Sequence, residues 1–296
     1  MKQMKWSLAL LMFAVFAIAG CNTDENSMPE GKGRLNVHLT DAPFPIQLVS
    51  STWVTIDRVE IRKTSDADAE EEDSSFMVIA EGEMEFDLLD LTNGITEQIA
   101  SVDLEPGSYD MIRLRVVDSK VTLNNGEVYD LKVPSGSTSG LKIKIHPAIM
   151  IEAGQTSDVL LDFDVSKSFV AKGNVAAGNI IGFNFKPVVR GVYLGAAGRI
   201  QGSVKDSLDN PLENARVNLL IPENEIEPGM EEEDMILVSS FTDEMGNFKL
   251  IGLHEGTYTA VCVLTGFKND TVFDIPVTAG ASTTVNFELE AETTEP

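Results

Sequence analysis

Asp162 and Asp164 are the residues whose type and spacing come closest to a chemical site. They stand two positions apart in the segment LDFDV, and the alternation of a strand places both carboxylates on the same face. Paired carboxylates can bind Ca²⁺, or act as acid and base in glycoside hydrolysis when a pocket holds them at the required separation. An outward polar face opposite Leu161, Phe163 and Val165 explains the same spacing. We expect the polar face, with a cation site as the alternative.

Asp41, in the segment LTDAPFP, is a further candidate carboxylate. Pro43 disfavours helical backbone at Ala42, and an Asp side chain at such a position can hydrogen-bond the backbone of its own turn. These two effects end a strand without a ligand. We therefore interpret Asp41 as a structural residue at a strand terminus.

The three histidines, His38, His146 and His254, lie in distant segments and show no zinc-site spacing. The sequence holds no HExxH motif, no Gly-x-Ser-x-Gly elbow, no phosphate loop and no dinucleotide fingerprint. It therefore predicts neither a metal site nor a cofactor, and it favours a protein that is not an enzyme. A hydrolase that uses Asp162 or Asp164 is the remaining catalytic hypothesis.

Two other features could contact a ligand. The ring of Trp53 could stack on a sugar, although we expect it to be buried in the core. The acidic run SDADAEEEDSS, residues 65–75, could attract a cation, but it lacks the spacing and the glycine of a calcium loop. We interpret this run as a solvated loop between strands.

Cys21 follows a segment with the plan of a secretory signal peptide. Two lysines precede an apolar run over residues 8–19, which is shorter than the about 20 residues that a membrane-spanning helix needs. Residues 1–20 are therefore predicted to be removed and to take no part in the fold. The segment IAGC, residues 18–21, resembles the lipobox of bacterial lipoproteins, and this resemblance implies that Cys21 carries the lipid of a membrane anchor.

The other cysteine, Cys262, has no partner for an internal disulfide once Cys21 is lipidated. It lies in a strand-like run in phase with Tyr258, Ala260 and Leu264. We therefore expect Cys262 to be a small buried hydrophobic residue rather than a reactive thiol.

The chain is strongly acidic, with 22 Lys and Arg against 47 Asp and Glu and a formal charge of −25. Loss of the signal peptide, whose only charges are two lysines, takes this to −27. Such a charge repels nucleic acids and anionic lipid surfaces, so we expect no nucleic-acid partner. Asp24 and Glu25, close behind Cys21, resemble a surface-export signal of some Gram-negative lipoproteins. We expect a lipid-anchored location at the bacterial outer membrane, on the cell surface, with a periplasm-facing orientation as the alternative.

The remaining sequence indicates an all-β protein, because short alternating runs are separated by turn residues and helical periodicity is absent. We predict two β-sandwich domains in tandem, over residues 33–194 and 198–290. A lipidated tether, residues 21–32, precedes them, and a disordered tail, residues 291–296, follows.

Several local features are predicted within these domains. The apolar phase slips between Ile56 and Val59, which indicates a β-bulge. Asn125-Gly126 predicts a hairpin whose tight turn has positive φ angles. We expect a strand at FDLLDL, a strand LKIKIHP that ends at Pro147, and one short helix within VSKSFVAKG.

The two domains resemble two known families. The C-terminal one is similar to the carboxypeptidase regulatory-like domain, a transthyretin-like sandwich of the carbohydrate-binding-like superfamily. That resemblance rests on Gly202, Val204, Asp206, Pro211, Leu212, Ala215, Val217, Thr242, Asp243, Gly246, Phe248, Leu250, Leu253, Gly256, Tyr258, Gly266 and Phe267. The N-terminal one resembles a lipoprotein domain of unknown function through LTDAP, VTIDRVEI, GSYDMIRLRV, LDFDVSKSFV and FKPVVRGV. The first resemblance implies an accessory, surface-display or glycan-associated module, and the second implies only fold and location.

The functional expectation is a non-enzymatic, lipid-anchored binding protein of the cell envelope. A carbohydrate is the leading ligand class, by analogy with the fold, and a surface protein is another potential partner. The alternative is a structural adhesion or pilus-like subunit that assembles through exposed edge strands. The sequence leaves the oligomeric state open.

Overall fold

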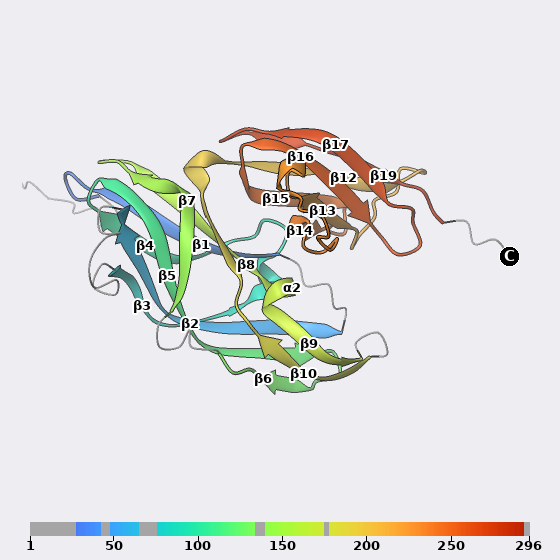
Figure 1. Ribbon diagram of the computed structural model, residues 1–296, viewed down its shortest axis with the longest axis horizontal. Helices are drawn as coiled ribbons and strands as arrows, with labels where there is room; N and C mark the ends of the chain where they lie inside the picture. Colours follow the sequence, from blue (N-terminus) through green and yellow to red (C-terminus); the bar gives the residue numbers. More distant parts are fainter. Residues whose placement is uncertain (1–27, 43–47, 65–75, 134–139, 175–177, 293–296) are drawn as a thin grey trace, which may run out of the picture.

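A computed structural model describes residues 28–42, 48–64, 76–133, 140–174 and 178–292, and it places them in two β-rich domains (Figure 1). The predicted all-β class and the tandem arrangement are confirmed. The lipidation candidate Cys21, the signal segment and the acidic run 65–75 lie outside the described residues. None of the helices in the described part is long and apolar enough to cross a membrane.

The N-terminal domain is built on a sheet in which the strand order is β3-β2-β5-β7-β11-β8-β1-β4, with β6 paired to β5. The strands are β1 (Gly33–Ala42), β2 (Val49–Lys63), β3 (Phe76–Asp87), β4 (Glu97–Leu104), β5 (Gly107–Leu123), β6 (Val128–Asp130), β7 (Leu141–Ile151), β8 (Thr156–Asp164) and β11 (Val189–Tyr193). β1 pairs with β8, and β7 with β11, in parallel, and the other pairings are antiparallel. The edge strands β3 and β4 come together, so the sheet folds around one core.

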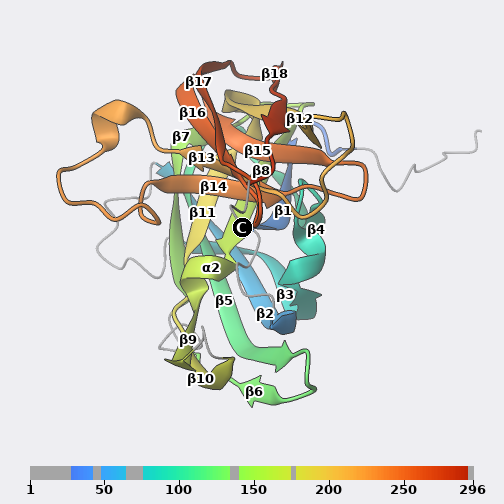
Figure 2. The same ribbon diagram turned by 90° about the vertical axis from the view of Figure 1, so that its right-hand side faces the viewer.

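Alternation along the strands supplies this core. Leu35, Val37 and Leu39 of β1 are fully buried, as are Leu161 and Phe163 of β8. A separate hairpin of β9 (Phe169–Asn174) and β10 (Asn179–Phe185) adds three phenylalanines to the same core. Figure 2 shows this hairpin and β6 at the end of the molecule that lies farthest from β17 and β18.

The C-terminal domain is a sandwich of two sheets around its own core. One sheet has the order β15-β12-β18, with β19 also paired to β12, and the other has the order β14-β13-β16-β17. The strands are β12 (Ala197–Asp206), β13 (Arg216–Leu220), β14 (Ile236–Phe241), β15 (Asn247–His254), β16 (Gly256–Val263), β17 (Asp270–Val277), β18 (Ser282–Thr284) and β19 (Phe287–Leu289). Cys262 is fully buried in this core, as predicted.

Some local predictions hold and others fail. The register of β2 shifts between Ile56 and Arg58, which confirms the bulge, and α2 (Val165–Ser168) is the expected short helix. The segment FDLLDL is a strand only over Phe86 and Asp87, the last residues of β3, because Asp87 Oδ1 accepts a bond from Leu89 N and caps the 3-10 helix η2 (Leu88–Leu91).

Three further predictions need correction. β7 continues through Pro147 to Ile151, and its ladder with β5 is interrupted there, passing from Lys144 to Ile149. In the hairpin turn after β5, Gly126 takes a positive φ of 86° and Asn125 does not. Residues 291 and 292 are part of the fold and not of the predicted tail, because Glu292 N donates a 2.8 Å bond to Gly266 O.

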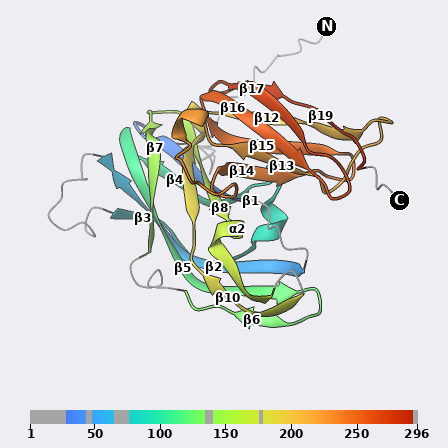
Figure 3. The ribbon, with the colours of Figure 1, turned by 45° about the vertical axis from the view of Figure 1, so that its right-hand side comes forward.

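The two domains meet along a buried seam. Leu160 and Val192 of the N-terminal sheet pack with Ala197 at the start of β12, and Leu194 and Ile251 complete this cluster. Ala197, which lies between the two predicted domains, is therefore part of the contact between them. Figure 3 shows β13 and β14 next to β8 and α2, and the packing of Leu160 against Ala197 and Ile251 covers the face of β8 opposite its core side.

Candidate binding sites at the domain interface

The face of β8 that carries Asp162 is not a solvated face. Asp162 is only 5% exposed, and its Oδ2 is 2.8 Å from a terminal nitrogen of Arg190. The other terminal nitrogen of Arg190 donates a 2.7 Å bond to Gly252 O in the C-terminal domain. The expected outward polar face is therefore wrong for Asp162, because the second domain covers it.

Asp41 and Asp164 both serve the short helix α2. Asp164 caps its N-terminus, where its Oδ1 accepts bonds from Lys167 N at 3.0 Å and Ser166 Oγ at 2.6 Å. Asp41 Oδ1 accepts a 3.1 Å bond from Val165 N, so it ties the end of β1 to the end of β8. Asp41 thus has a structural contact far away in sequence, whereas the part of its turn at residues 43–47 lies outside the described residues.

The histidines occupy different surroundings. His38 Nε2 is 3.1 Å from Asp158 Oδ1 within the N-terminal sheet. His146 and His254 come from different domains, and burial lowers the pKa of His254, with the charges of Arg190 and His146 adding to the effect. Within the described residues, no group of three or more His, Cys, Asp or Glu is arranged to hold a metal ion.

Trp53 is not a core residue, which corrects the sequence-based expectation. It lies half-buried on β2, and the ammonium group of Lys120 lies 5.2 Å from the centre of its ring. Because the adjoining residues Thr52 and Val54 are fully buried, alternation turns the Trp53 ring to the outer face of the sheet. A sugar could stack on this ring only after displacing Lys120.

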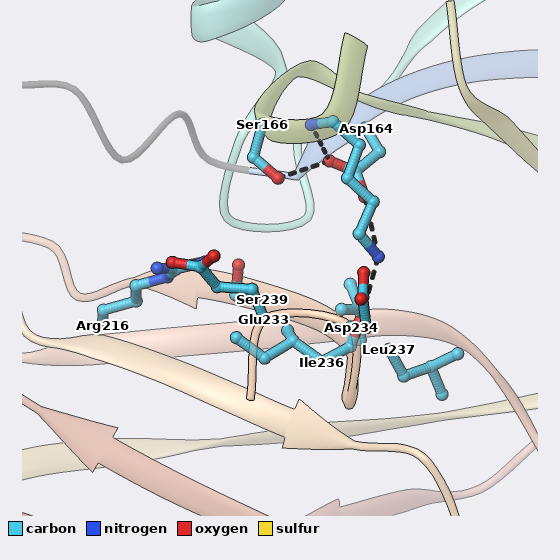
Figure 4. A pocket seen from close by; sticks show the side chains of 10 residues that line it. Asp164, Ser166, Arg216, Glu233, Asp234, Ile236, Leu237 and Ser239 are labelled. Carbon is cyan, nitrogen blue, oxygen red and sulfur yellow. Dashed lines mark hydrogen bonds and ion pairs between the residues drawn. The ribbon is translucent and has the colours of Figure 1, made fainter. Parts of the chain in front are cut away.

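A cavity of about 300 Å³ lies between α2 of the N-terminal domain and β13, β14 and the segment that joins them. We call it the charged pocket. Its lining consists of Asp164, Ser166, Lys167, Arg216, Glu233, Asp234, Ile236, Leu237, Val238 and Ser239. Figure 4 shows Asp164 and Ser166 facing the C-terminal residues across the cavity, with Arg216 beside Glu233. This volume is at the lower end of the range for small-molecule sites, about 300–1,000 Å³.

Lys167 spans the charged pocket. Its ammonium group is 3.5 Å from Asp164 Oδ2 and donates a 3.3 Å bond to Ile236 O on β14. Arg216 comes from β13, where alternation points Val217 into the core and Arg216 out of it. Burial lowers the pKa of Arg216 even though the carboxylates of Glu233 and Asp164 favour its charge.

A second, more open depression of about 480 Å³ runs over β12 and β15. We call it the amide groove. It is lined by Asn93, Gln201, Gly202, Ser203, Asn247, Phe248, Lys249, Thr284 and Asn286. Lys249 is the one charged side chain in this lining, and amides and hydroxyls supply most of the polar groups.

Hydrogen bonds orient the amides of the groove. Asn93, in the N-terminal domain, accepts a 3.2 Å bond from Ser240 Oγ through its Oδ1 and directs its Nδ2 to Asn247 O at 3.4 Å. Asn286 Oδ1 accepts bonds from Ser203 N at 3.0 Å and Ser203 Oγ at 3.1 Å. These bonds leave Asn286 Nδ2 as a donor, and among the described residues neither Nδ2 nor the exposed Gln201 amide has a partner.

Sequence reasoning missed the residues of both depressions. Arg216 stands in an ordinary alternating strand, ARVNLL, and the groove amides are single residues scattered over two strands and two connecting segments. The weak signal for the charged pocket was the acidic insertion after β13, which supplies Glu233 and Asp234.

Two family models match the chain. One, described as a domain of unknown function (DUF4382), matches residues 32–187, and the other, described as a carboxypeptidase regulatory-like domain, matches residues 199–290. No curated protein matches.

Solved structures give distant similarities only. The 3-chlorocatechol 1,2-dioxygenase of Rhodococcus opacus 1CP is 14% identical over 33% of this chain and 61% of its own, with a TM-score of 0.25. The TIE protein of Bacillus anthracis is 14% identical over 88% of this chain and 34% of its own, with a TM-score of 0.24. The minor pilin GBS52 of Streptococcus agalactiae is 11% identical over 88% of this chain and 98% of its own, with a TM-score of 0.26. The chain thus spans less than two thirds of the first two proteins, and similarities of this size do not support an inference about activity.

Proposed function

Since the chain belongs to the family of the domain of unknown function DUF4382 and carries a carboxypeptidase regulatory-like domain, we propose a function in binding. The proposed protein is a non-enzymatic, lipid-anchored binding protein of the bacterial cell envelope. A carbohydrate is the proposed ligand class, and the amide groove is the proposed binding site. The anchor is the lipid on Cys21, which places the two domains at the outer membrane, on the cell surface.

The composition of the amide groove carries the carbohydrate proposal. A sugar hydroxyl is at once a hydrogen-bond donor and an acceptor, and so is an amide side chain. Among the described residues, Asn286 Nδ2 and the Gln201 amide have no hydrogen-bond partner, and Ser203 and Thr284 add hydroxyls. Because the groove is open and nearly uncharged, it fits the middle of a neutral glycan chain better than a small ion.

A glycan array tests this proposal. The full-length mature protein, purified in detergent, is expected to retain a set of neutral oligosaccharides. A Gln201→Ala/Asn286→Ala double variant is expected to bind these oligosaccharides at least about tenfold more weakly, because each lost hydrogen bond contributes about 0.5–1.5 kcal/mol. Asn184→Ala, an exposed amide on β10, is the matched control. Retention of no glycan, or equal retention by the double variant, would contradict the proposal.

Lipidation and exposure have their own tests. Metabolic labelling with an alkyne fatty acid is expected to mark the wild-type protein and not a Cys21→Ser variant, which should leave the membrane fraction. Proteinase K added to intact cells is expected to digest the wild-type protein. Protection from the protease would place the domains on the periplasmic side instead.

Assembly through edge strands is the second candidate function, and it has one specific observation behind it. β17 is an edge strand of the C-terminal domain, and its Phe273 is 64% exposed. However, Asp274 adopts a positive φ of 53° and Pro276 lacks an N–H, and both features hinder further strand pairing. Concentration-dependent polymers that disappear in a Phe273→Lys variant would favour this function over glycan binding.

A further inference from the structure

Two buried polar atoms on β13 lack partners among the described residues. They are Arg216 Nε and Asn218 Oδ1, and both residues belong to the face of β13 that points away from the core. Roughly 90% or more of buried polar groups in proteins are hydrogen-bonded, so each exception calls for an explanation. Arg216 lines the charged pocket, so a rotation of its side chain would turn the buried Nε toward an acceptor inside this pocket.

The carboxylates around Arg216 do not fully compensate its positive charge, so an anion can bind there. Asp164 is already engaged by Lys167, Ser166 and the backbone of α2. Glu233 and Asp234 are exposed, so water screens them. Burial lowers the pKa of Arg216 more than the acidic neighbours raise it, which means that these neighbours do not offset the cost of burying the guanidinium.

The remaining lining narrows the chemistry of the ligand. A guanidinium holds a carboxylate through two parallel N–H bonds, which would satisfy Arg216 Nε. Glu233 and Asp234 only accept hydrogen bonds when ionised, so the rest of the ligand must offer donors such as hydroxyl groups. Ile236 and Leu237 provide an apolar wall, which suits the C–H face of a small ring.

We propose that the charged pocket binds a small hydroxylated carboxylate of the sugar-acid class, with its carboxylate on Arg216 and its hydroxyl donors on Glu233 and Asp234. This site lies on a different set of residues from the amide groove and does not depend on it. Because the pocket is formed by both domains, the ligand would contact them at the same time.

A pair of probes that differ only in the carboxylate tests the proposal. In calorimetric titrations of the full-length mature protein, D-glucuronate is expected to bind and D-glucose to bind at least about tenfold more weakly, because a hydrogen bond to a charged group is worth about twice a neutral one. Equal affinity for the two probes, or no binding of glucuronate, would overturn the proposal.

Variants locate the binding. Arg216→Gln is expected to lower the affinity for glucuronate at least about tenfold and to leave the affinity for glucose unchanged. Arg216→Lys keeps the charge and loses the planar guanidinium, so its affinity for glucuronate should lie between those of the wild-type protein and Arg216→Gln. If Arg216→Gln fails to fold, Arg216→Lys carries the test. Arg199→Gln removes an exposed arginine outside the pocket and is the matched control. Glucuronate binding that is indifferent to Arg216 would overturn the proposal.

The double variant of the amide groove distinguishes the two proposals. Gln201→Ala/Asn286→Ala is expected to bind glucuronate as the wild-type protein does. A protein that binds glucuronate through Arg216 and no neutral glycan would refute the function proposed for the amide groove and leave the charged pocket standing. Loss of glucuronate binding in this double variant would overturn the assignment to the charged pocket.

Discussion

Arg190 lies where the two domains meet, and its removal tests how they are coupled. It bonds Asp162 at 2.8 Å on its own domain and Gly252 O at 2.7 Å on the other. In an Arg190→Met variant, Asp162 stays buried and loses its ion-pair partner. Breaking a buried ion pair from one side costs about 3–5 kcal/mol. Since the Arg190 side chain is 24% exposed, we expect the lower end, about 3 kcal/mol.

Each domain carries its own probe for this measurement. Trp53 is the only tryptophan after the signal segment, so its fluorescence reports on the N-terminal domain. The fully buried thiol of Cys262 reports on the C-terminal domain through its reaction with Ellman's reagent. With a urea m-value of about 3 kcal/mol/M, a loss of about 3 kcal/mol lowers the Trp53 midpoint by roughly 1 M. We expect the Trp53 and Cys262 transitions to coincide in the wild-type protein, and the lost bond to Gly252 O should separate them in the variant.

A matched variant controls for the loss of an arginine. Arg34 forms an ion pair with Asp103 at 2.9 Å on the N-terminal domain, where both side chains are partly exposed. Arg34→Met is therefore expected to cost about 1 kcal/mol or less and to leave the two transitions together. If Arg190→Met shifts the midpoint no more than Arg34→Met does, or if both reporters still unfold together, the coupling through Arg190 is refuted.

Three further outcomes follow from the C-terminal domain. Burial raises the pKa of Cys262 to about 12, so the native thiol should not react with Ellman's reagent at pH 8 and should react on unfolding; fast native reaction would contradict this. Hydrogen bonds from the Asn210 side chain and backbone lower the pKa of Asp206. The ionised carboxylate therefore stabilises the folded protein fully above the pKa of Asp206 in the unfolded chain, and this stabilisation is lost as the pH falls through its pKa in the folded protein. In an Asp206→Asn variant, the melting temperature should change less between pH 5 and pH 2 than it does in the wild-type protein. A Cβ at Gly202 would lie 1.5 Å from Val285 O, so Gly202→Ala should destabilise by roughly 2 kcal/mol or more in urea. Gly256→Ala is the control, because a Cβ there would come no closer than 3.4 Å to its neighbours and the backbone needs no positive φ.

The fold was predictable because its signals are local. The alternation of Leu35, Val37 and Leu39 depends only on residues two positions apart, and the bulge near Ile56 shows as a slip in that phase. The errors at FDLLDL and Pro147 have local causes too. Asp87 turns an apolar run into a capped 3-10 helix, and the strand continues past a proline where its ladder is interrupted.

The sites were not predictable, because alternation defines two faces of a strand and does not say what covers them. The sequence pattern of the polar face of β8 is the same whether water or a second domain covers that face. Asp162 was therefore predicted to be solvated, although it is buried. Arg216, Gln201 and Asn247 lie on strands where outward polar residues are ordinary, and Asn93 and Asn286 lie in segments between elements, where polar residues are ordinary too. Their significance comes from Asn93 and α2 of the other domain: Asn93 lies 154 residues before Asn247, and Lys167 of α2 lies 69 residues before Ile236.

The polar contacts between the domains connect binding to stability. Arg190, Lys167 and Asn93 each reach from the N-terminal domain to a backbone carbonyl of the C-terminal one, so the relative placement of the domains rests on hydrogen bonds as well as on apolar packing. A ligand in the charged pocket would add contacts that exist only when both domains are folded and docked. Linkage then requires such a ligand to stabilise the docked form by RT ln(1 + [L]/Kd), about 2.7 kcal/mol at a hundredfold excess over Kd. Glucuronate should therefore restore part of the stability that Arg190→Met removes and bring the Trp53 and Cys262 transitions back together. A ligand bound to one domain alone would raise one midpoint and drive the two transitions further apart.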